Sequence, residues 1–343
     1  MGELRLAGHR LEGAVLPMDL SSRQMKGVPV RTIETPIFLT GSERSGTTLL
    51  RLMLDHHPQI AFNLESEFLV TGISETGAFP DMASYRRALR ENRVFRHSRF
   101  DIRDDLDYPA LMNDFLRQKL ERDRKSVVGA TVHYGFGKLR YVWPEAKYIY
   151  MLRDGRDVAS SIVEMGWAGN AFIGANWWLE AEREWAALRG SLAPDRWIEV
   201  RYEELIGNPA AQLARICDLI GVGFSERMFD YAKTSSYSLP DPSQAGKWRR
   251  KMAPGEIRLL EARMGPQLAA RGYELSRTTP RRIAPIQAAW LRLESRVKVL
   301  RRKAAAFGLW LFTVELVSRR LGWTAVNGRA QHAIDALIDQ NLK

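Results

Sequence analysis

Cysteine and long apolar runs are scarce in this chain. Cys217 is the single cysteine among 343 residues, which excludes an internal disulfide framework and any zinc or iron–sulfur site built on cysteine ligands. No uninterrupted apolar stretch reaches the roughly eighteen residues that a transmembrane helix needs, and residues 1–30 lack the sustained apolar segment of a signal peptide. We therefore predict a cytoplasmic chain with no membrane-spanning helix.

Acidic residues are too few to balance the basic ones. The chain has 51 Lys and Arg against 40 Asp and Glu, a net charge of +11. Residues 277–343 carry most of the excess, with 13 basic and 4 acidic side chains, so residues 1–276 are close to neutral. An enzyme of nucleic acids carries its basic residues around the working domain. The distribution therefore argues against a nucleic-acid partner and favours a membrane-surface or partner-binding tail.

What the chain does have is the alternation of an α/β protein. Its hydrophobic content of 45% is ample for a core. Five short apolar or β-branched runs predict buried strands: 37–40, 60–62, 127–131, 148–152 and 197–201. Helical patterns lie between or after them, at 48–57, 108–121, 158–164, 175–188 and 210–220. We expect a parallel β-sheet flanked by helices, with ligands bound beyond the carboxyl ends of the strands.

A phosphate-binding loop follows the first predicted strand. Gly41 and Gly46 are separated by four residues and followed by Thr47 and Thr48, the spacing of a P-loop-like turn before a helix. A nucleoside-triphosphate site places lysine where Thr47 stands, so the loop suits a single phosphate-like group and leaves Arg44 as its cation. A small-molecule kinase on the same scaffold is the alternative that the missing lysine disfavours.

A second anion anchor follows the fourth predicted strand. Arg153 leaves this strand, and Ser161 lies eight residues later in a predicted helix, so a phosphate near the strand end has two donors. The structural alternative is an Arg153 that pairs with Asp154 or Asp157.

Two long motifs contain the loop and the second anchor. The first is FLTGSERSGTTLLRLMLDHHPQIAFNLESEF over Phe38–Phe68, and the second is VWPEAKYIYMLRDGRDVASS over Val142–Ser161. Two shorter motifs follow, RYEELIGNP over Arg201–Pro209 and GKW over Gly246–Trp248. Together they resemble the sulfotransferase family, especially its bacterial and tyrosylprotein branches, over roughly residues 35–275 and in the family's order.

The resemblance implies a donor, 3′-phosphoadenosine 5′-phosphosulfate (PAPS), and no metal. It implies that the first loop holds the 5′-phosphosulfate through Arg44, Ser45, Gly46, Thr47 and Thr48. It likewise assigns the 3′-phosphate to Arg153 and Ser161, a late phosphosulfate contact to Lys247, and support of the nucleotide to Tyr202 and Trp248. Core packing is the alternative for Tyr202 and Trp248. A non-catalytic binding protein on this fold is a further alternative, which the intact loop disfavours.

Two residues compete for the role of the catalytic base. Glu65 lies twenty-one residues after Arg44, where the resemblance places the glutamate of tyrosylprotein sulfotransferases. His133, after the third predicted strand, has the place of the histidine of the small-molecule branch, and imidazole suits a base at neutral pH. We favour Glu65. Glu43 stands where the family commonly has proline, and it either faces solvent or pairs with Arg44.

We divide the chain into an extension (1–34), a catalytic domain (35–276) and a basic helical tail (277–343). The tail carries a seven-residue apolar repeat formed by Ile286, Trp290, Leu293, Val297, Leu300, Ala304, Phe307, Leu311 and Val314. Three roles are open for it: peripheral contact at the inner membrane surface, a homodimer helix, or packing on the body.

We expect the acceptor to be a hydroxyl-bearing molecule. Residues 70–125 contain several arginines among aromatic residues, a composition that fits either binding of an anionic acceptor or ordinary solvated helices.

Overall fold

The computed structural model describes residues 33–276 and 282–308, with residues 310, 313, 314, 317, 318 and 333. Of the predicted extension, only residues 33 and 34 are described. The chain forms two compact units, divided after Arg153, Leu179 and Ala245. We call the unit with 33–153 and 180–245 the sheet unit, and the unit with 154–179 and the residues from 246 onward the helical unit.

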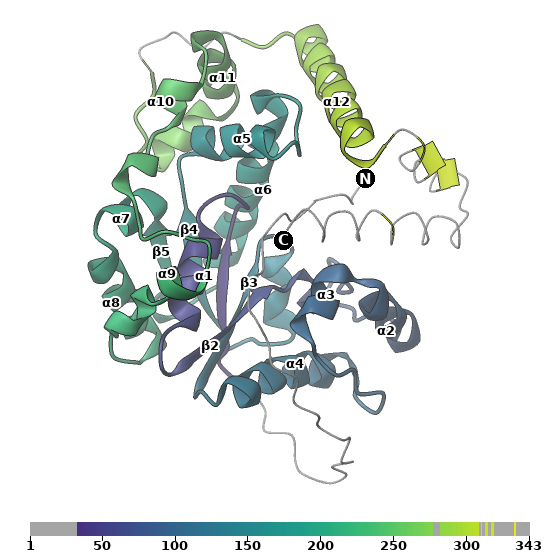
Figure 1. Cartoon of the computed structure of the whole chain (residues 1–343), viewed down its shortest axis with the longest axis vertical. Coiled ribbons are helices and arrows are strands. Elements are labelled where there is room, and N and C mark those ends of the chain that lie inside the picture. Colours follow the sequence, from purple (N-terminus) through teal and green to yellow (C-terminus); the bar gives the residue numbers. More distant parts are fainter. Residues whose placement is uncertain are drawn as a thin grey trace. The chain divides into compact units, whose positions relative to one another are not determined.

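The sheet unit is built on five parallel strands, which confirms the predicted fold class (Figure 1). The strands are β1 (Ile37–Gly41), β2 (Ile60–Glu65), β3 (Val127–Val132), β4 (Lys147–Leu152) and β5 (Trp197–Arg201), in the order β2-β3-β1-β4-β5. In the parallel pairing, Ile37 of β1 lies opposite Gly129 of β3 on one side and Lys147 of β4 on the other. Every residue of β1 is buried, which explains why the central strand reads as a continuous apolar run.

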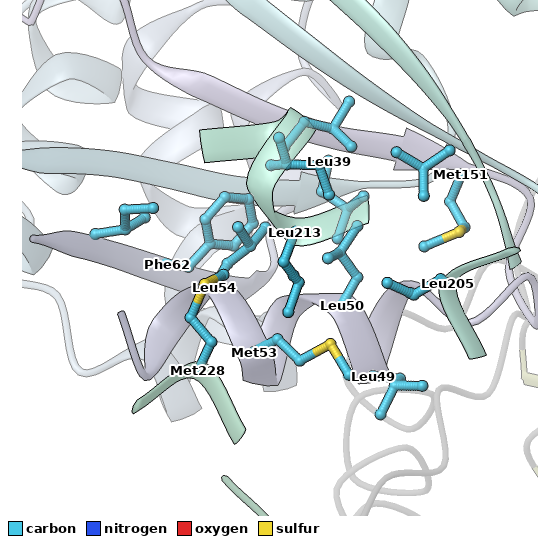
Figure 2. Close-up of a cluster of buried hydrophobic side chains, with 14 of the residues drawn as sticks. Leu39, Leu49, Leu50, Met53, Leu54, Phe62, Met151, Leu205, Leu213 and Met228 are labelled. Atoms are coloured by element: carbon cyan, nitrogen blue, oxygen red, sulfur yellow. The ribbon is translucent and has the colours of Figure 1, made fainter. Parts of the chain in front are cut away.

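One face of the sheet is covered by three helices that follow strand ends. They are α1 (Thr47–Asp55), α7 (Tyr202–Gly207) and α8 (Pro209–Ile220). Their apolar side chains form one cluster with β1, β2 and β4, in which Leu50, Met53 and Leu54 of α1 are fully buried (Figure 2). Because this packing fixes α1, the loop between β1 and α1 is held at both ends.

Aromatic side chains of β1 and β4 point to the opposite face. Phe38 packs on Trp143 and Tyr148, and Tyr150 stacks on Trp185 of α6 (Ala171–Arg189) with ring centroids 4.6 Å apart. Residue i and residue i+2 of a strand share a face, so this set and the cluster around α1 alternate along the strands. Both faces of the sheet are therefore occupied by side chains.

Residues 66–126 insert a helical segment between β2 and β3. It comprises η1 (Glu67–Leu69), α2 (Met82–Glu91), α3 (Arg93–Ser98) and α4 (Tyr108–Asp123), the last packed on β2 and β3. Its aromatic residues gather in a buried cluster, with Phe100 and Phe115 stacked at 5.5 Å. Arg86 donates to the carbonyl oxygen of Leu106. The aromatics of this segment are thus core residues, except for Phe79, which is 41% exposed.

Short elements complete the two units. In the sheet unit they are η2 (Phe136–Tyr141), η3 (Pro194–Arg196), η4 (Glu226–Phe229), α9 (Tyr231–Thr234) and η5 (Pro242–Gln244). The helical unit contains α5 (Gly155–Glu164), the first half of α6, α10 (Trp248–Lys251), α11 (Pro254–Ala270) and α12 (Pro285–Phe307).

A buried arginine organises the helical unit. Arg156 is fully buried, and its guanidinium binds both carboxylate oxygens of Asp154 and lies 2.7 Å from Oε1 of Glu261. It also stacks on the ring of Trp248 at 3.7 Å. These contacts join α5, α10 and α11 around one charge.

Helix α12 begins at Pro285, a residue that suits the first turn of a helix, and ends at Phe307. The apolar repeat was expected to continue to Val314; the described helix is shorter because Gly308 has a left-handed φ of 80°, and Leu311 lies outside the described residues. Among the described helices, none is both long and apolar enough to span a bilayer.

Candidate active site

The loop after β1 has a backbone that only particular residues tolerate. Gly41 and Gly46 have φ values of 135° and 95°, and Arg44 between them has a φ of 67°. A Cβ at Gly41 would lie 2.5 Å from the carbonyl oxygen of Met151, and one at Gly46 would lie 2.3 Å from the ring of Tyr202. Both glycines therefore allow the turn. Gly41 also lets the backbone pass close to β4, and Gly46 leaves room for the ring of Tyr202.

The start of α1 is open to an anion. Its N-cap residue is Gly46, which makes no side-chain capping hydrogen bond. Ser45 is buried, and its hydroxyl has no hydrogen-bond partner among the residues that the structure describes. Backbone N–H groups and a waiting hydroxyl at a helix N-terminus are what a phosphate or sulfate group requires.

Arg153 connects the end of β4 to this loop. Its Nη1 donates to the carbonyl oxygen of Arg44 at 2.9 Å, and its guanidinium lies 4.3 Å from the centroid of Tyr202. Tyr202 in turn fills the space beside Gly46. The sheet unit thus brings together four residues that the sequence predicted separately, and Asp154, the alternative partner of Arg153, binds Arg156.

His133 closes the other side of the loop. Its Nε2 lies 3.0 Å from Oγ1 of Thr47, and its Nδ1 lies 3.0 Å from Oε1 of Glu67. The backbone N–H of His133 donates to the same carboxylate oxygen at 3.1 Å. Both ring nitrogens are therefore engaged, one by the loop and one by a carboxylate.

Electrostatics favour the charged form of this histidine. Burial by itself lowers the pKa of His133, but the hydrogen bond and charge of Glu67, with the charges of Glu43 and Glu65, outweigh it and raise the pKa above the ordinary 6.5. Glu43 is largely buried, so its carboxylate belongs to this charge cluster and does not face solvent. The raised pKa thus favours a positive charge on His133, directly after β3 and beside Thr47.

Glu65 lies at the end of β2, where the strand pairing is irregular. The register with β3 shifts between Asn63 and Glu65, which re-aims the side chains at the strand end. The next residue, Ser66, is fixed by bonds from its N–H to the carbonyl oxygen of Thr131 and from Asn63 to its hydroxyl. Glu65 is half-buried and close enough to His133 to affect its pKa.

Comparison with known proteins identifies the family of the chain. The sequence pattern of the sulfotransferase family matches residues 36–226, from β1 through α8. The chain belongs to the sulfotransferase family. Protein-tyrosine sulfotransferase A of Caenorhabditis elegans is 24% identical over 214 residues, which cover 57% of this chain and 52% of that protein.

A bacterial relative matches at a similar level. The omega-hydroxy-beta-dihydromenaquinone-9 sulfotransferase of Mycobacterium tuberculosis is 26% identical over 196 residues, 50% of this chain and 47% of that protein. The chain therefore spans about half the length of these two sulfotransferases. Among solved structures, the sulfotransferase domain of the Synechococcus PCC 7002 olefin synthase superposes with a TM-score of 0.52 at 22% identity, covering 73% of this chain and 100% of that domain. That likeness supports the fold.

Three of the predicted donor residues belong to the helical unit. Ser161 lies in α5, and Lys247 directly precedes α10. Trp248 is buried; its Nε1 donates to Asp154 at 2.9 Å and its backbone N–H to Asp157 at 2.7 Å. These contacts give Trp248 a packing role in its own unit, and the parts of all three residues in donor binding stay predictions.

Glu67 is the site residue to which the sequence assigned no role. It is a polar residue just beyond the end of β2, but its spacing gives no sign of a contact with His133, which is sixty-six residues away. In the described part of the chain, no cluster of His, Cys, Asp and Glu has the arrangement of a metal site.

Proposed function

We propose that this sulfotransferase-family protein moves a sulfuryl group from PAPS to a hydroxyl. The observation that carries the proposal is the loop itself: an uncapped helix start and a buried Ser45 hydroxyl with no partner among the described residues, with Thr47 in the lysine position and bound to His133. This arrangement fits one phosphosulfate group better than a triphosphate chain. When bound, PAPS supplies the sulfuryl group and the phosphate leaving group.

In this proposal, cations and backbone N–H groups do the work that metal ions do in kinases. Arg44, Ser45, Gly46, Thr47 and Thr48 hold the 5′-phosphosulfate. His133 keeps the Thr47 hydroxyl in one orientation from 3.0 Å away and adds positive charge where the leaving phosphate gains negative charge. No divalent metal is needed for this charge balance.

Arg153 and Tyr202 are proposed to hold the nucleotide end of the donor. The hydrogen bond from Arg153 to the carbonyl oxygen of Arg44 fixes the Arg153 guanidinium, which also packs on the ring of Tyr202. Ser161, Lys247 and Trp248 are proposed to add further donor contacts, as the family resemblance implies.

We assign the base to Glu65. Both ring nitrogens of His133 are already bonded, and its raised pKa favours the protonated ring, which cannot accept a proton. Glu65 is a half-buried carboxylate of the same cluster. The acceptor proton passes to Glu65 as the acceptor oxygen bonds to sulfur, and the bond between sulfur and the phosphate oxygen breaks in line.

The acceptor is proposed to be a hydroxyl-bearing molecule: a glycan, lipid, tyrosine or small molecule. The names of the two relatives, a protein-tyrosine sulfotransferase and a hydroxylated menaquinone sulfotransferase, indicate hydroxyl acceptors for those proteins. A cytoplasmic location is proposed as well, since Cys217 is a buried free thiol that needs no oxidising compartment.

Glu65→Gln tests the assignment of the base. Labelled sulfate is first transferred from PAPS into a cell extract, and the labelled lipid, glycan, protein or small-molecule pool then serves as the acceptor. We expect turnover to fall at least about a hundredfold in Glu65→Gln, because the amide cannot take the proton. The affinity for 3′-phosphoadenosine 5′-phosphate, measured by calorimetry, should stay within about twofold.

Two outcomes would contradict these proposals separately. Near-wild-type turnover of Glu65→Gln, with a large loss in His133→Gln, would move the base to His133. Transfer of label from ATP, with none from PAPS, would instead establish a kinase.

A further inference from the structure

Helix α12 has one docked face. Within the helical unit, the N–H of Gly169 donates to Oγ of Ser295 at 2.9 Å, and Asn170 donates to the carbonyl oxygen of Leu291 at 2.8 Å. Further along the helix, Nη2 of Arg302 donates to the carbonyl oxygen of Glu164 at 2.8 Å. Ser295 is 4% exposed as a result. The helix is therefore an anchored element of its unit.

The opposite face of α12 is apolar and open. The side chains of the seven-residue repeat lie on the side of the helix away from Ser295 and Arg302. Their exposed fractions are 81% for Ile286, 65% for Trp290, 52% for Leu293, 38% for Val297 and 42% for Leu300. A continuous apolar stripe of this kind marks an interaction surface.

Basic residues border the stripe. Residues 285–307 contain six Lys and Arg but a single acidic residue, Glu294. Glu294 is already committed, with Oε1 2.6 Å from Nζ of Lys298 and Oε2 accepting from Asn170. Arg292, Arg296 and Arg301 are exposed beside the apolar side chains. The partner of this face must therefore tolerate apolar contact and offer negative charge.

A second copy of α12 does not offer the negative charge that this face requires. In a parallel coiled coil with Leu293 at a d position, Arg296 at g would face Arg301 at the next e of the other helix. In an antiparallel pair, the g positions Ala289, Arg296 and Lys303 would face one another. Both arrangements set basic side chains against each other, so charge disfavours a homodimer through this face.

We propose that the open face of α12 binds an anionic membrane surface, with the helix in the plane of the interface. Trp290 and Leu293 enter the boundary between headgroups and acyl chains, while Arg292, Arg296 and Arg301 contact the lipid phosphates. The described part of α12 is suited to lie on a bilayer, since no described helix is able to cross one. This proposal does not depend on the sulfuryl-transfer activity.

Vesicle sedimentation with the full-length protein tests the proposal. The protein should sediment with vesicles of mixed phosphatidylcholine and phosphatidylglycerol, and far less with phosphatidylcholine alone. Each arginine near an anionic surface contributes roughly fivefold to binding, so Arg296→Gln with Arg301→Gln should weaken it about thirtyfold. Trp290→Ala should weaken it about tenfold through lost apolar insertion.

Matched controls separate the helix from general surface effects. Arg87→Gln removes an exposed arginine of α2, and Leu239→Ala removes an exposed apolar side chain of the sheet unit; both should leave sedimentation unchanged. Circular dichroism of every variant confirms that the fold is kept. Equal sedimentation of the α12 variants and the controls would overturn the proposal. A dimer in light scattering that Leu293→Asp converts to a monomer would overturn it in favour of a second copy.

Discussion

At the scale of single residues, the loop pairs a threonine with a histidine from another part of the chain. Thr47 holds the position at which a triphosphate loop has its cation, and His133 lies 3.0 Å from its hydroxyl. Glu67 holds His133 from the other side. The positive charge is thus set by three residues in three parts of the chain, and a change at any one of them would disturb it.

Removing Glu67 should lower the pKa of His133. In Glu67→Gln, the hydrogen bond and charge that oppose the effect of burial are lost, so we expect the pKa to fall. NMR titration of the His133 ring proton measures both values. An unchanged pKa would show that Glu67 does not carry the charge that the distance indicates.

The raised pKa of His133 also predicts a pH dependence of stability. Because the folded-state pKa is raised, protonation of His133 contributes stability that is fully present below about pH 6.5 and lost as pH rises through the folded pKa. Denaturation of wild type and His133→Gln should therefore differ most at low pH. A folded state that binds this proton tenfold more tightly than the unfolded chain gains about 1.4 kcal/mol of unfolding free energy. A difference between the two proteins that is constant from pH 5 to pH 9 would contradict the linkage.

The sequence predicted the loop, Arg153 and His133 one at a time, but it did not predict the contacts that these residues make with their neighbours. The loop, Arg153 and His133 stand out because each follows an apolar strand. Glu67 and the stacking of Arg153 on Tyr202 depend on which strands are neighbours, and the order β2-β3-β1-β4-β5 is a property of the fold. Contacts across a sheet leave no periodic trace along the chain.

At the scale of elements, the five strands were predicted to within a few residues because each contains a short apolar or β-branched run. Helices α2, α3, α7 and α11 were not predicted: α3 and α7 have only six residues each, too few to show a helical period, and α11 contains Pro266 inside the helix. The end of α12 at Phe307 was missed because Gly308 reverses the backbone where apolar spacing continues.

Two glycine substitutions should separate backbone strain from crowding. Gly46 and Gly221 both have left-handed φ values, 95° and 87°, but only a Cβ at Gly46 meets a neighbour, the Tyr202 ring. We expect Gly221→Ala to cost about 1 kcal/mol of unfolding free energy and Gly46→Ala roughly 1–3 kcal/mol more. Equal losses in urea denaturation would mean that Tyr202 moves aside freely.

At the scale of the whole molecule, the net charge of +11 separates into two roles. The residues before 277 are nearly neutral and contain the donor loop, while the charge lies in the tail that includes the exposed face of α12. The isoelectric point therefore describes the tail and says little about the chemistry.

Donor binding should stabilise the protein in proportion to its occupancy. At a hundred times its Kd, 3′-phosphoadenosine 5′-phosphate should add about 2.7 kcal/mol, which raises Tm by about 5–10 °C. Arg153→Met should lose most of this rise in Tm, and Arg87→Met, an exposed control on α2, should keep it. A larger rise with ATP in differential scanning fluorimetry would contradict the assigned donor.

Arg44 has a left-handed backbone conformation that arginine adopts at a cost. Glycine and asparagine adopt a φ of 67° at lower cost than arginine does, so folding alone does not require arginine at this position. Under the proposed function, the Arg44 side chain is needed for the phosphosulfate group and not for the turn. Laboratory evolution for heat resistance, if run without a screen for activity, would discard it early and produce a more robust but inert protein.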